Sequence, residues 1–434
     1  MINSTVVLSD NAILLDLTHY RHNLIEGSMD PSKTRISSNN ILYVGGYNSN
    51  NYSTIQKAIK DAQKGDTIFV YEYSSPYNEN IVIDKSVVLI GENTETTIID
   101  GQYQSSTVIV SADNITIKNF TIQNSAHNQN DAGLIINSDG NLVQNVILIN
   151  NEHGVRFEYS RNSIFLENKI ENNNQNSIFI SESSNLYIYE NTIKNSNTGI
   201  DINKGATYNE IYANSIQNME KGIFLFSSSH NSIYWNIISN SVYAIYLDEA
   251  NENEIYNENV ISDNMNGIFL VNSFSNKIYD ENLIKDNEFG VIIESSFNND
   301  VNENIIRNND YGVLLNKSFQ NDIYWNQITE NHKGIYIQYS YQNEIYLNNI
   351  INNYQTGLFI ELSTFTKIFY NNFIENYISA SFIIDFLSFN MWKKNYWDDW
   401  SGNGVYRIPG NIIDFDTDVW YNYDFKPKDS LYDL

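Results

Sequence analysis

A small residue followed by alternating apolar positions recurs along most of the chain, at intervals of 21 to 23 residues. Each small residue opens a segment such as GIFL, in which apolar and variable positions alternate before a polar turn. An asparagine-led segment such as NEIY and a third short segment such as NSIQN complete the repeat. Alternation with a period of two predicts short β-strands. The small residue stands at Gly133, Gly154, Ser177, Gly199, Gly222, Ala244, Gly267, Gly290, Gly312, Gly334, Gly357 and Ala380.

This period predicts a solenoid, because one coil of three short strands cannot bury its own inner face. Stacked coils, about 4.8 Å apart, bury a continuous column of isoleucine, leucine and valine. We expect the asparagines at the corners, in left-handed backbone conformations, with amides bonded to the coils above and below. The chain is therefore predicted to be all-β, a single-stranded right-handed parallel β-helix. A leucine-rich repeat is the main alternative, but it needs a fixed leucine framework that this chain lacks.

The two ends depart from the repeat. Four apolar residues at helical spacing predict a short helix that caps the first coil: Ile55, Ala58, Ile59 and Ala62. Four tryptophans predict a large apolar cap on the last coil: Trp392, Trp397, Trp400 and Trp420. The predicted organisation is a lead segment over 1–40, a cap with the first coils over 41–125, repeats over 126–390 and a C-terminal cap over 391–434.

Charge and composition remove several classes of function. The chain carries a net charge of −27, which repels nucleic acid. It has no cysteine, which excludes disulfides, thiolate metal sites and cysteine nucleophiles. No stretch is long and apolar enough to span a membrane, and the first residues do not read as a signal peptide. The sequence assigns no oligomeric state.

Three segments resemble the NosD-like right-handed parallel β-helix proteins, a carbohydrate-binding and sugar-hydrolase type of β-helix with a pectin-lyase-like fold. They are the opening TIQKAIKDAQKGDTIFV, the N-x-I-Y-x-N and N-x-x-G-I repeat, and the closing NYWDDWSGNGVYRIPG. Together they cover nearly everything from residue 41 to the C-terminus. The resemblance implies the fold, an archaeal or bacterial source and an extracellular or cell-surface location. It does not transfer an activity, because one fold hosts many functions.

The name-giving members of that family are linked to copper delivery in a periplasm. Copper favours clustered cysteine, methionine or histidine, whereas the five methionines and six histidines of this chain are scattered. His127 and His153 lie about one coil apart, and two histidines alone make a poor site. A copper-binding accessory role is therefore not expected. The opening strands also resemble pectin esterases, but the paired glutamine and aspartate motifs of those enzymes are absent.

Aromatic residues recur at two positions that we expect to point outward. Sugars stack on such rings through their C–H faces, although stacked rings also stabilise neighbouring strands without any ligand. The stripe two residues after each small residue reads Ile135, Arg156, Phe179, Asp201, Phe224, Tyr246, Phe269, Ile292, Leu314, Tyr336, Phe359 and Phe382. The stripe in the asparagine-led strand reads Phe165, Tyr187, Tyr212, Tyr234, Tyr256, Tyr279, Tyr324, Tyr346 and Phe369.

Polar residues gather near the start of the first stripe. Arg156, Glu158 and Asp201 lie within about two coils, at a separation that suits an inverting pair of carboxylates. In that reading Asp201 is the general acid, Glu158 the base and Arg156 an anchor for a carboxylate or hydroxyl. A solvated, salt-bridged face is the alternative. The residues predicted to bind a glycan on this face are Phe179, Asn203, Lys204, Phe224, Tyr246, Asp248 and Phe269.

Two acidic segments near the C-terminus suggest calcium, although no cofactor is required by either reading. The first places oxygen ligands at alternate positions before a glycine, like the first half of a calcium loop: Asp399, Ser401 and Asn403. Gly410 stands where such a loop would carry glutamate. The second places three carboxylates on one face of an extended segment: Asp414, Asp416 and Asp418. A polar turn in the cap is the alternative at both places.

Short turns and exposed aromatic stripes favour a surface-type β-helix that binds or scaffolds polysaccharide or a cell-surface glycan. A polysaccharide lyase or glycoside hydrolase acting on the face of Arg156 and Asp201 is the first alternative. A structural rod or assembly module is the second, because stacked outward ladders can also be self-complementary.

Overall fold

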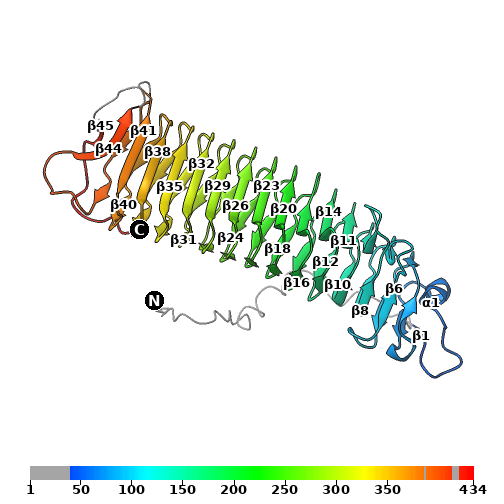
Figure 1. Cartoon of the computed structure of the whole chain (residues 1–434). Helices are drawn as coiled ribbons and strands as arrows, with labels where there is room; N and C mark the ends of the chain where they lie inside the picture. The colour runs from blue at the N-terminus through cyan, green and yellow to red at the C-terminus, as the bar shows by residue number, and fades with distance from the viewer. Residues whose placement is uncertain (1–39, 386–387, 413–419) are drawn as a thin grey trace. The chain divides into compact units, whose positions relative to one another are not determined.

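The computed structural model describes residues 40–385, 388–412 and 420–434. Nearly all of the 45 strands run parallel, and each generally pairs with the third strand after it, which gives about 15 turns of a right-handed parallel solenoid. Figure 1 shows these coils stacked in sequence from β1 to β45. The predicted fold class is confirmed, and the leucine-rich alternative is excluded by the three strands in each coil.

The strands form three faces. Face 1 contains β4 (Ile81–Ile83), β7 (Val108–Val110), β9 (Ala132–Ile136), β11 (His153–Glu158), β14 (Asn176–Ser181), β17 (Thr198–Ile202), β20 (Lys221–Phe226), β23 (Tyr243–Asp248), β26 (Asn266–Val271), β29 (Phe289–Glu294), β32 (Tyr311–Asn316), β35 (Lys333–Gln338), β38 (Thr356–Glu361), β41 (Ala380–Ile384) and β44 (Tyr406–Ile412).

Face 2 contains β1 (Ile41–Val44), β2 (Thr67–Val70), β5 (Val88–Gly91), β12 (Ile164–Leu166), β15 (Tyr187–Tyr189), β18 (Glu210–Tyr212), β21 (Ser232–Tyr234), β24 (Glu254–Tyr256), β27 (Lys277–Ile278), β30 (Asp300–Asn302), β33 (Asp322–Tyr324), β36 (Glu344–Tyr346), β39 (Lys367–Phe369), β42 (Met391–Lys393) and β45 (Trp420–Asp424). The long strands β8 (Thr116–Gln123) and β10 (Leu142–Ile149) run from face 2 into face 3.

Face 3 contains β3 (Tyr77–Asn78), β6 (Ile98–Asp100), β13 (Lys169–Glu171), β16 (Thr192–Lys194), β19 (Ser215–Gln217), β22 (Ile237–Ser239), β25 (Val260–Ser262), β28 (Leu283–Lys285), β31 (Ile305–Arg307), β34 (Gln327–Thr329), β37 (Asn349–Ile351), β40 (Asn372–Ile374) and β43 (Tyr396–Trp397). Apolar side chains from all three faces meet inside. On face 1, for example, Ile200, Ile223 and Ile245 pair in register and are fully buried. This column is the main source of stability, because it removes apolar surface from water.

Buried asparagines run through the corners as hydrogen-bonded ladders. In the longest ladder the backbone N–H of Asn236 donates to Oδ1 of Asn259, at 2.9 Å, and the side-chain amide of Asn236 donates to the same oxygen, at 3.2 Å. The members of this asparagine ladder are Asn168, Asn191, Asn214, Asn236, Asn259, Asn282, Asn304, Asn326, Asn348, Asn371 and Asn395. The predicted bonding between coils is therefore present.

The expected left-handed conformation of the ladder asparagines is wrong. The left-handed residue is the one just before the ladder position, such as Trp235 or Leu347, each with φ of 55°. Turning the chain at that residue lets the next side chain point inward and bond to the neighbouring coil. At another corner the left-handed residue often is an asparagine, as at Asn195 and Asn218.

The repeat shifts by one residue in its last coil. Leu358 pairs with Ala380, and the position opposite Gly357 is taken by Ser379 rather than by Ala380. Phe382 is consequently buried, with an exposed fraction of 2%, although we predicted that it points outward. A slip of one residue exchanges the two sides of a strand, and the apolar run ASFII does not reveal which side faces the core.

The helix predicted near the N-terminal end is present as α1 (Ile55–Asp61), followed by a single 3₁₀ turn (Glu72–Ser74). The hydroxyl of Thr54 accepts a hydrogen bond from the backbone N–H of Lys57, and α1 packs against β1, β2 and β4. At the other end Trp392 and Trp397 are buried, whereas Trp420 is exposed. Within the described residues, no helix has the length and apolar character needed to cross a membrane.

Candidate functional site

The polar residues and the first aromatic stripe form one column on the outside of face 1. Strand pairing places Arg156 opposite Phe179, and Phe179 opposite Asp201. The column continues through Phe224, Tyr246 and Phe269. Successive members stand about 4.8 Å apart along the solenoid axis. Arg156 and Asp201 are thus separated by two coils, as their spacing in the sequence predicts.

Arg156 is held in place by its neighbours. Its Nε donates to Oε1 of Glu158, at 2.9 Å, and its Nη2 forms an ion pair with the same carboxylate. The Nη1 of Arg156 donates to the carbonyl of Gln129, at 3.2 Å, and the guanidinium lies 4.5 Å from the centre of the Phe179 ring. Glu158, which we predicted to be a base, is therefore already engaged by Arg156.

Asp201 is a buried carboxyl group with one oxygen unused. Only 8% of its surface is exposed, and its Oδ2 accepts a hydrogen bond from the Asn176 amide, at 2.8 Å. Its Oδ1 is buried and has no hydrogen-bond partner among the described residues. Burial raises the pKa of Asp201 to about 6, against smaller lowering effects from Asn176 and Lys221. The predicted ligand-binding residues Asn203 and Lys204 follow directly, half-buried and exposed respectively.

His153 lies at the start of the same face and is fixed by two hydrogen bonds. Its Nδ1 accepts from the backbone N–H of Asn176, at 3.3 Å, which leaves the proton on Nε2. Nε2 lies 2.9 Å from the carbonyl oxygen of Gln129. Burial lowers the pKa of His153, which favours this neutral form. The loop that carries Gln129 therefore closes the N-terminal side of the Arg156 region.

The rings of the first stripe stack on each other. The centre of the Tyr246 ring lies 5.1 Å from that of Phe224 and 5.2 Å from that of Phe269. Lys221 covers the Phe224 ring, with its Nζ 4.0 Å from the ring centre. Because neighbouring rings occupy each other's faces, the sugar stacking that we predicted is restricted to ring edges and to the ends of the stack. Asp248 lies on the same strand as Tyr246 and is half-buried.

The second stripe begins later than predicted. Phe165 pairs with Ile188 and is fully buried, and Tyr187 occupies a different outward position, opposite Glu210. The stacked column starts at Tyr189, because the segment NLYIY carries one more residue before its outward tyrosine than NEIY does. Its first continuous part consists of Tyr189, Tyr212, Tyr234, Tyr256 and Tyr279, and a second consists of Tyr324, Tyr346 and Phe369.

A third aromatic ladder was missed by the sequence analysis. Phe274, Phe297, Phe319 and Tyr341 stack at a corner with ring-centre separations of 5.1, 5.0 and 4.9 Å. Its signal is present in the sequence, since each of these residues stands two positions before a buried asparagine. The three ladders together indicate that stacking between coils is a general structural device of this solenoid.

The first predicted calcium segment is an exposed loop before β44. Asp399, Ser401 and Asn403 are all exposed, and Oδ2 of Asp399 accepts a hydrogen bond from the Tyr406 hydroxyl, at 3.1 Å. Calcium binding by this loop stays a prediction. The second segment, with Asp414, Asp416 and Asp418, lies outside the described residues.

A comparison with known families identifies the family to which the chain belongs. A family model described as periplasmic copper-binding protein (NosD) matches residues 59–254 and again residues 235–403. The chain belongs to the NosD family. Pectinesterase 2 of Citrus sinensis is 31% identical to this NosD chain over 106 residues. That match covers 22% of this chain and only 21% of the length of the pectinesterase.

Two solved structures similar to this chain have low sequence identity to it. XylC in complex with xylose matches with a TM-score of 0.52 and 12% identity, over 61% of this chain and 75% of XylC. The A-module of AlgE6, a mannuronan C-5 epimerase of Azotobacter vinelandii, covers 82% of this chain and 92% of its own. Its TM-score is 0.37, with 14% identity. The likeness to XylC shows the fold alone.

The donors of this NosD chain do not fit copper in the part of the chain that the structure describes. Within residues 40–385, 388–412 and 420–434, no group of three or more histidine, cysteine, aspartate or glutamate residues could hold a metal. Both ring nitrogens of His153 are engaged by the backbone. His127 contacts the Asn174 amide through its Nδ1, and Glu152 lies 3.5 Å from that nitrogen. Neither histidine therefore supplies an unoccupied imidazole nitrogen beside another soft donor.

Proposed function

We propose that this protein binds polysaccharide, outside the cytoplasm, along the outer surface of face 1 between β11 and β26. The observation that carries the proposal is the unused oxygen of Asp201. A buried acceptor without a donor costs free energy, and a ligand hydroxyl that donates to Oδ1 would recover it. A sugar chain offers such donors at regular intervals.

The surroundings of Asp201 support an extended ligand. Further hydrogen-bonding groups lie next to Asp201. They belong to Asn203 and Lys221, which are half-buried, and to Lys204, which is exposed. Coils repeat about every 4.8 Å, so similar groups can meet successive sugars of one chain. XylC, which shares the fold, is described in complex with xylose, and the matched pectinesterase and the epimerase are named for polysaccharide substrates. The description of the NosD family as periplasmic supports the location.

Titration calorimetry with oligosaccharides of xylan, homogalacturonan and alginate would test the proposal. The variants Asp201→Asn and Lys221→Met should each weaken binding by about tenfold, the value of one lost charge-assisted hydrogen bond. Asp263→Asn is the matched control, because Asp263 is an exposed corner residue that follows face 3. Equal affinity of the Asp201→Asn variant and the unchanged protein would show that this face is not the binding surface.

Catalysis at the same place is the second candidate. The pKa of Asp201, raised to about 6, suits a carboxylic acid that donates a proton, and Arg156 stands two coils away. A hydrolase would release new reducing ends, and a lyase would also form unsaturated ends that absorb ultraviolet light. Loss of either product in Asp201→Asn, with binding retained by Asp201→Glu, would favour catalysis. Unchanged polysaccharide would leave binding as the function.

A further inference from the structure

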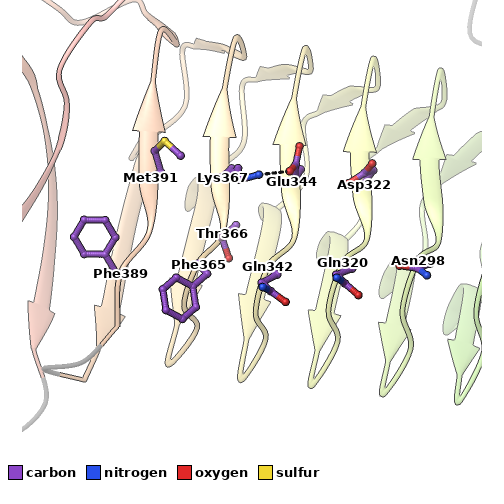
Figure 2. A pocket seen from close by; sticks show the side chains of 10 residues that line it. All are labelled: Asn298, Gln320, Asp322, Gln342, Glu344, Phe365, Thr366, Lys367, Phe389 and Met391. Atoms are coloured by element: carbon purple, nitrogen blue, oxygen red, sulfur yellow. Dashed lines mark hydrogen bonds and ion pairs between the residues drawn. The ribbon is translucent and has the colours of Figure 1, made fainter.

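An open groove of about 610 Å³ lies on face 2 near its C-terminal end, far along the chain from Asp201. Figure 2 shows that its side chains form two rows, with one member from each coil. One row stands at the corner and contains Asn298, Gln320, Gln342, Phe365 and Phe389. The other stands on the strands and contains Asp322, Glu344, Lys367 and Met391. The groove therefore presents amides, carboxylates and aromatic rings at the same regular spacing.

The two aromatic rings differ from those of the ladders. Phe365 is 58% exposed and Phe389 is 72% exposed. Neither ring stacks on another ring of the described residues, whereas Phe274, Phe297 and Phe319 are stacked in the coils before them. Exposed, unstacked phenylalanine is costly unless it meets a partner. Their faces can therefore receive the C–H face of a sugar or a cation.

The strand row carries more negative charge than its lysines neutralise. Lys367 pairs with Glu344, with Nζ 2.6 Å from Oε1, as the dashed line in Figure 2 marks. Outside the groove, on two earlier coils of face 2, Lys277 pairs with Glu254, at 3.7 Å. Asp300 and Asp322 lie between these pairs on adjacent coils, and neither forms an ion pair within the described part of the chain. Burial and then repulsion from Glu344 and Asp300 raise the pKa of Asp322 to about 6.

Thr366 adds an unused buried hydroxyl to the floor of the groove. It takes the position that Asn321 and Asn343 hold in the preceding coils, and its backbone N–H donates to Oδ1 of Asn390, at 3.0 Å. Its side chain is fully buried, and its Oγ1 has no hydrogen-bond partner among the described residues. At this ladder position the asparagines of the preceding coils use their side-chain amides in hydrogen bonds, whereas the hydroxyl of Thr366 is left without a partner.

From these features we infer a second binding site, which takes an oligosaccharide of amino sugars. A β-1,4-linked glucosamine chain is extended, has apolar C–H faces for Phe365 and Phe389, and carries hydroxyls for the amides of Gln320 and Gln342. Its ammonium groups match the carboxylate of Asp322 in the groove and that of Asp300 on the adjacent coil. The net charge of −27 attracts such a cationic chain and repels an acidic one. The site shares no residue with the surface proposed on face 1.

Titration calorimetry at low salt, slightly above the pKa of Asp322, would test this site with a glucosamine hexamer. We expect saturable binding, weakened by about tenfold in Asp322→Asn and in Phe389→Ala, since each removes one charge-assisted or aromatic contact. Glu210→Gln is the matched control, because Glu210 has the same strand position on face 2 outside the groove. Its affinity should not change, and neither should that of Asp201→Asn.

Three comparison ligands test whether binding requires both the sugar chain and its positive charge. The N-acetylglucosamine hexamer has the same shape without charge, hexalysine has the charge without sugar, and a galacturonate hexamer has the opposite charge. All three should bind at least about tenfold more weakly than the glucosamine hexamer. Equal binding of the N-acetylated hexamer or of hexalysine would overturn the inference. Unchanged affinity in both groove variants, or binding lost in Asp201→Asn instead, would also overturn it.

Discussion

Asp424 occupies the position beyond Asn395 in the asparagine ladder and ends it with a carboxylate. Oδ2 of Asp424 accepts hydrogen bonds from the backbone N–H of Asn395, at 2.8 Å, and from its side-chain amide, at 3.1 Å. The indole N–H of Trp397 donates to the same oxygen, at 3.2 Å, and the backbone N–H of Lys394 donates to Oδ1. Asp424 is fully buried. One side chain from β45 thus satisfies the last donors of the coil before it.

Replacing Asp424 by alanine should loosen the C-terminal coil. The change leaves several buried N–H donors without an acceptor, and each such group costs about 1–3 kcal/mol. We expect the midpoint of urea unfolding to fall markedly and the indole fluorescence of the buried tryptophans to change at lower urea. Asp429→Ala, at an exposed position that follows β45, is the control. A urea unfolding curve identical to that of the unchanged protein would contradict the capping role.

The small residue of the repeat should tolerate alanine better than valine. A Cβ atom at Gly222 would lie 2.5 Å from the carbonyl oxygen of Ala244 and 2.8 Å from a methyl group of Ile238. Ala244 itself takes the equivalent position in the next coil, so one methyl group can be accommodated there. Gly222→Val should cost about 1–3 kcal/mol by overpacking, and Gly222→Ala distinctly less. Equal thermal stability of the two variants would show that this corner does not require a small residue.

The middle of the asparagine ladder should be sensitive to loss of one amide. The side-chain amide of Asn326 donates to the carbonyls of Val301 and Tyr324 and to Oδ1 of Asn348. Asn326→Ala should lower the free energy of unfolding by about 3 kcal/mol, since buried carbonyls lose their donor. The adjacent exposed Gln327→Ala should have little effect. Chemical denaturation of both variants measures the difference, and similar curves would argue against the ladder as a source of stability.

Asp201 makes stability depend on pH in a defined direction. Its pKa is raised from 3.8 to about 6 in the folded state, so the folded protein binds this proton more tightly than the unfolded chain does. Its destabilising effect is therefore absent below about pH 3.8, grows as pH rises through 6, and reaches about 3 kcal/mol near neutrality. Asp201→Asn should stabilise the protein near neutral pH, and this gain should shrink towards about pH 4. Unfolding curves across that range measure it; a gain that did not depend on pH would disprove the assignment.

The aromatic stack on face 1 should contribute to stability as well as to any binding. Tyr246 contacts the rings of both Phe224 and Phe269, and each such contact contributes about 0.5–1.5 kcal/mol beyond burial. Tyr246→Ala should therefore destabilise the protein more than Tyr187→Ala, because the Tyr187 ring stacks on no other ring of the described residues. The thermal midpoints of the two variants check this, and the reverse order would contradict it.

The fold could be predicted from the sequence because the same pattern of small, apolar and polar positions recurs in every repeat. Alternation at Ile223 and Leu225 is ambiguous alone, but its return in every coil identifies the inner side. At the last coil the apolar run around Phe382 gave no such contrast, and the predicted side was wrong. The ladder asparagines were also found, whereas the left-handed residues before them, such as Trp235, follow no residue type and only the backbone reveals them.

The candidate sites were predictable only where one column carries them. Arg156 and Asp201 share a strand position, so their alignment in one column on face 1 follows from the period of the repeat. The groove of Phe389 and Asp322 combines a corner row with a strand row, so no single column of the repeat predicts it. The sequence also does not predict that one oxygen of Asp201 and the hydroxyl of Thr366 lack a hydrogen-bond partner. This property depends on the positions of the surrounding donors and acceptors in the folded structure.

The carboxylate of Asp424 also ends the series of hydrogen bonds that runs along the asparagine ladder. An asparagine side chain both accepts from the coil before and donates onward, so it can relay hydrogen bonds indefinitely. A carboxylate only accepts, and the relay that passes through Asn371 and Asn395 stops there. The hydrogen bonds of the ladder all run in one direction, from each coil to the next. They end at Asp424 because its side chain has an oxygen where asparagine has the donating amide nitrogen. Another coil, or the end of a second molecule, therefore finds no donor with which to continue the series at this side chain.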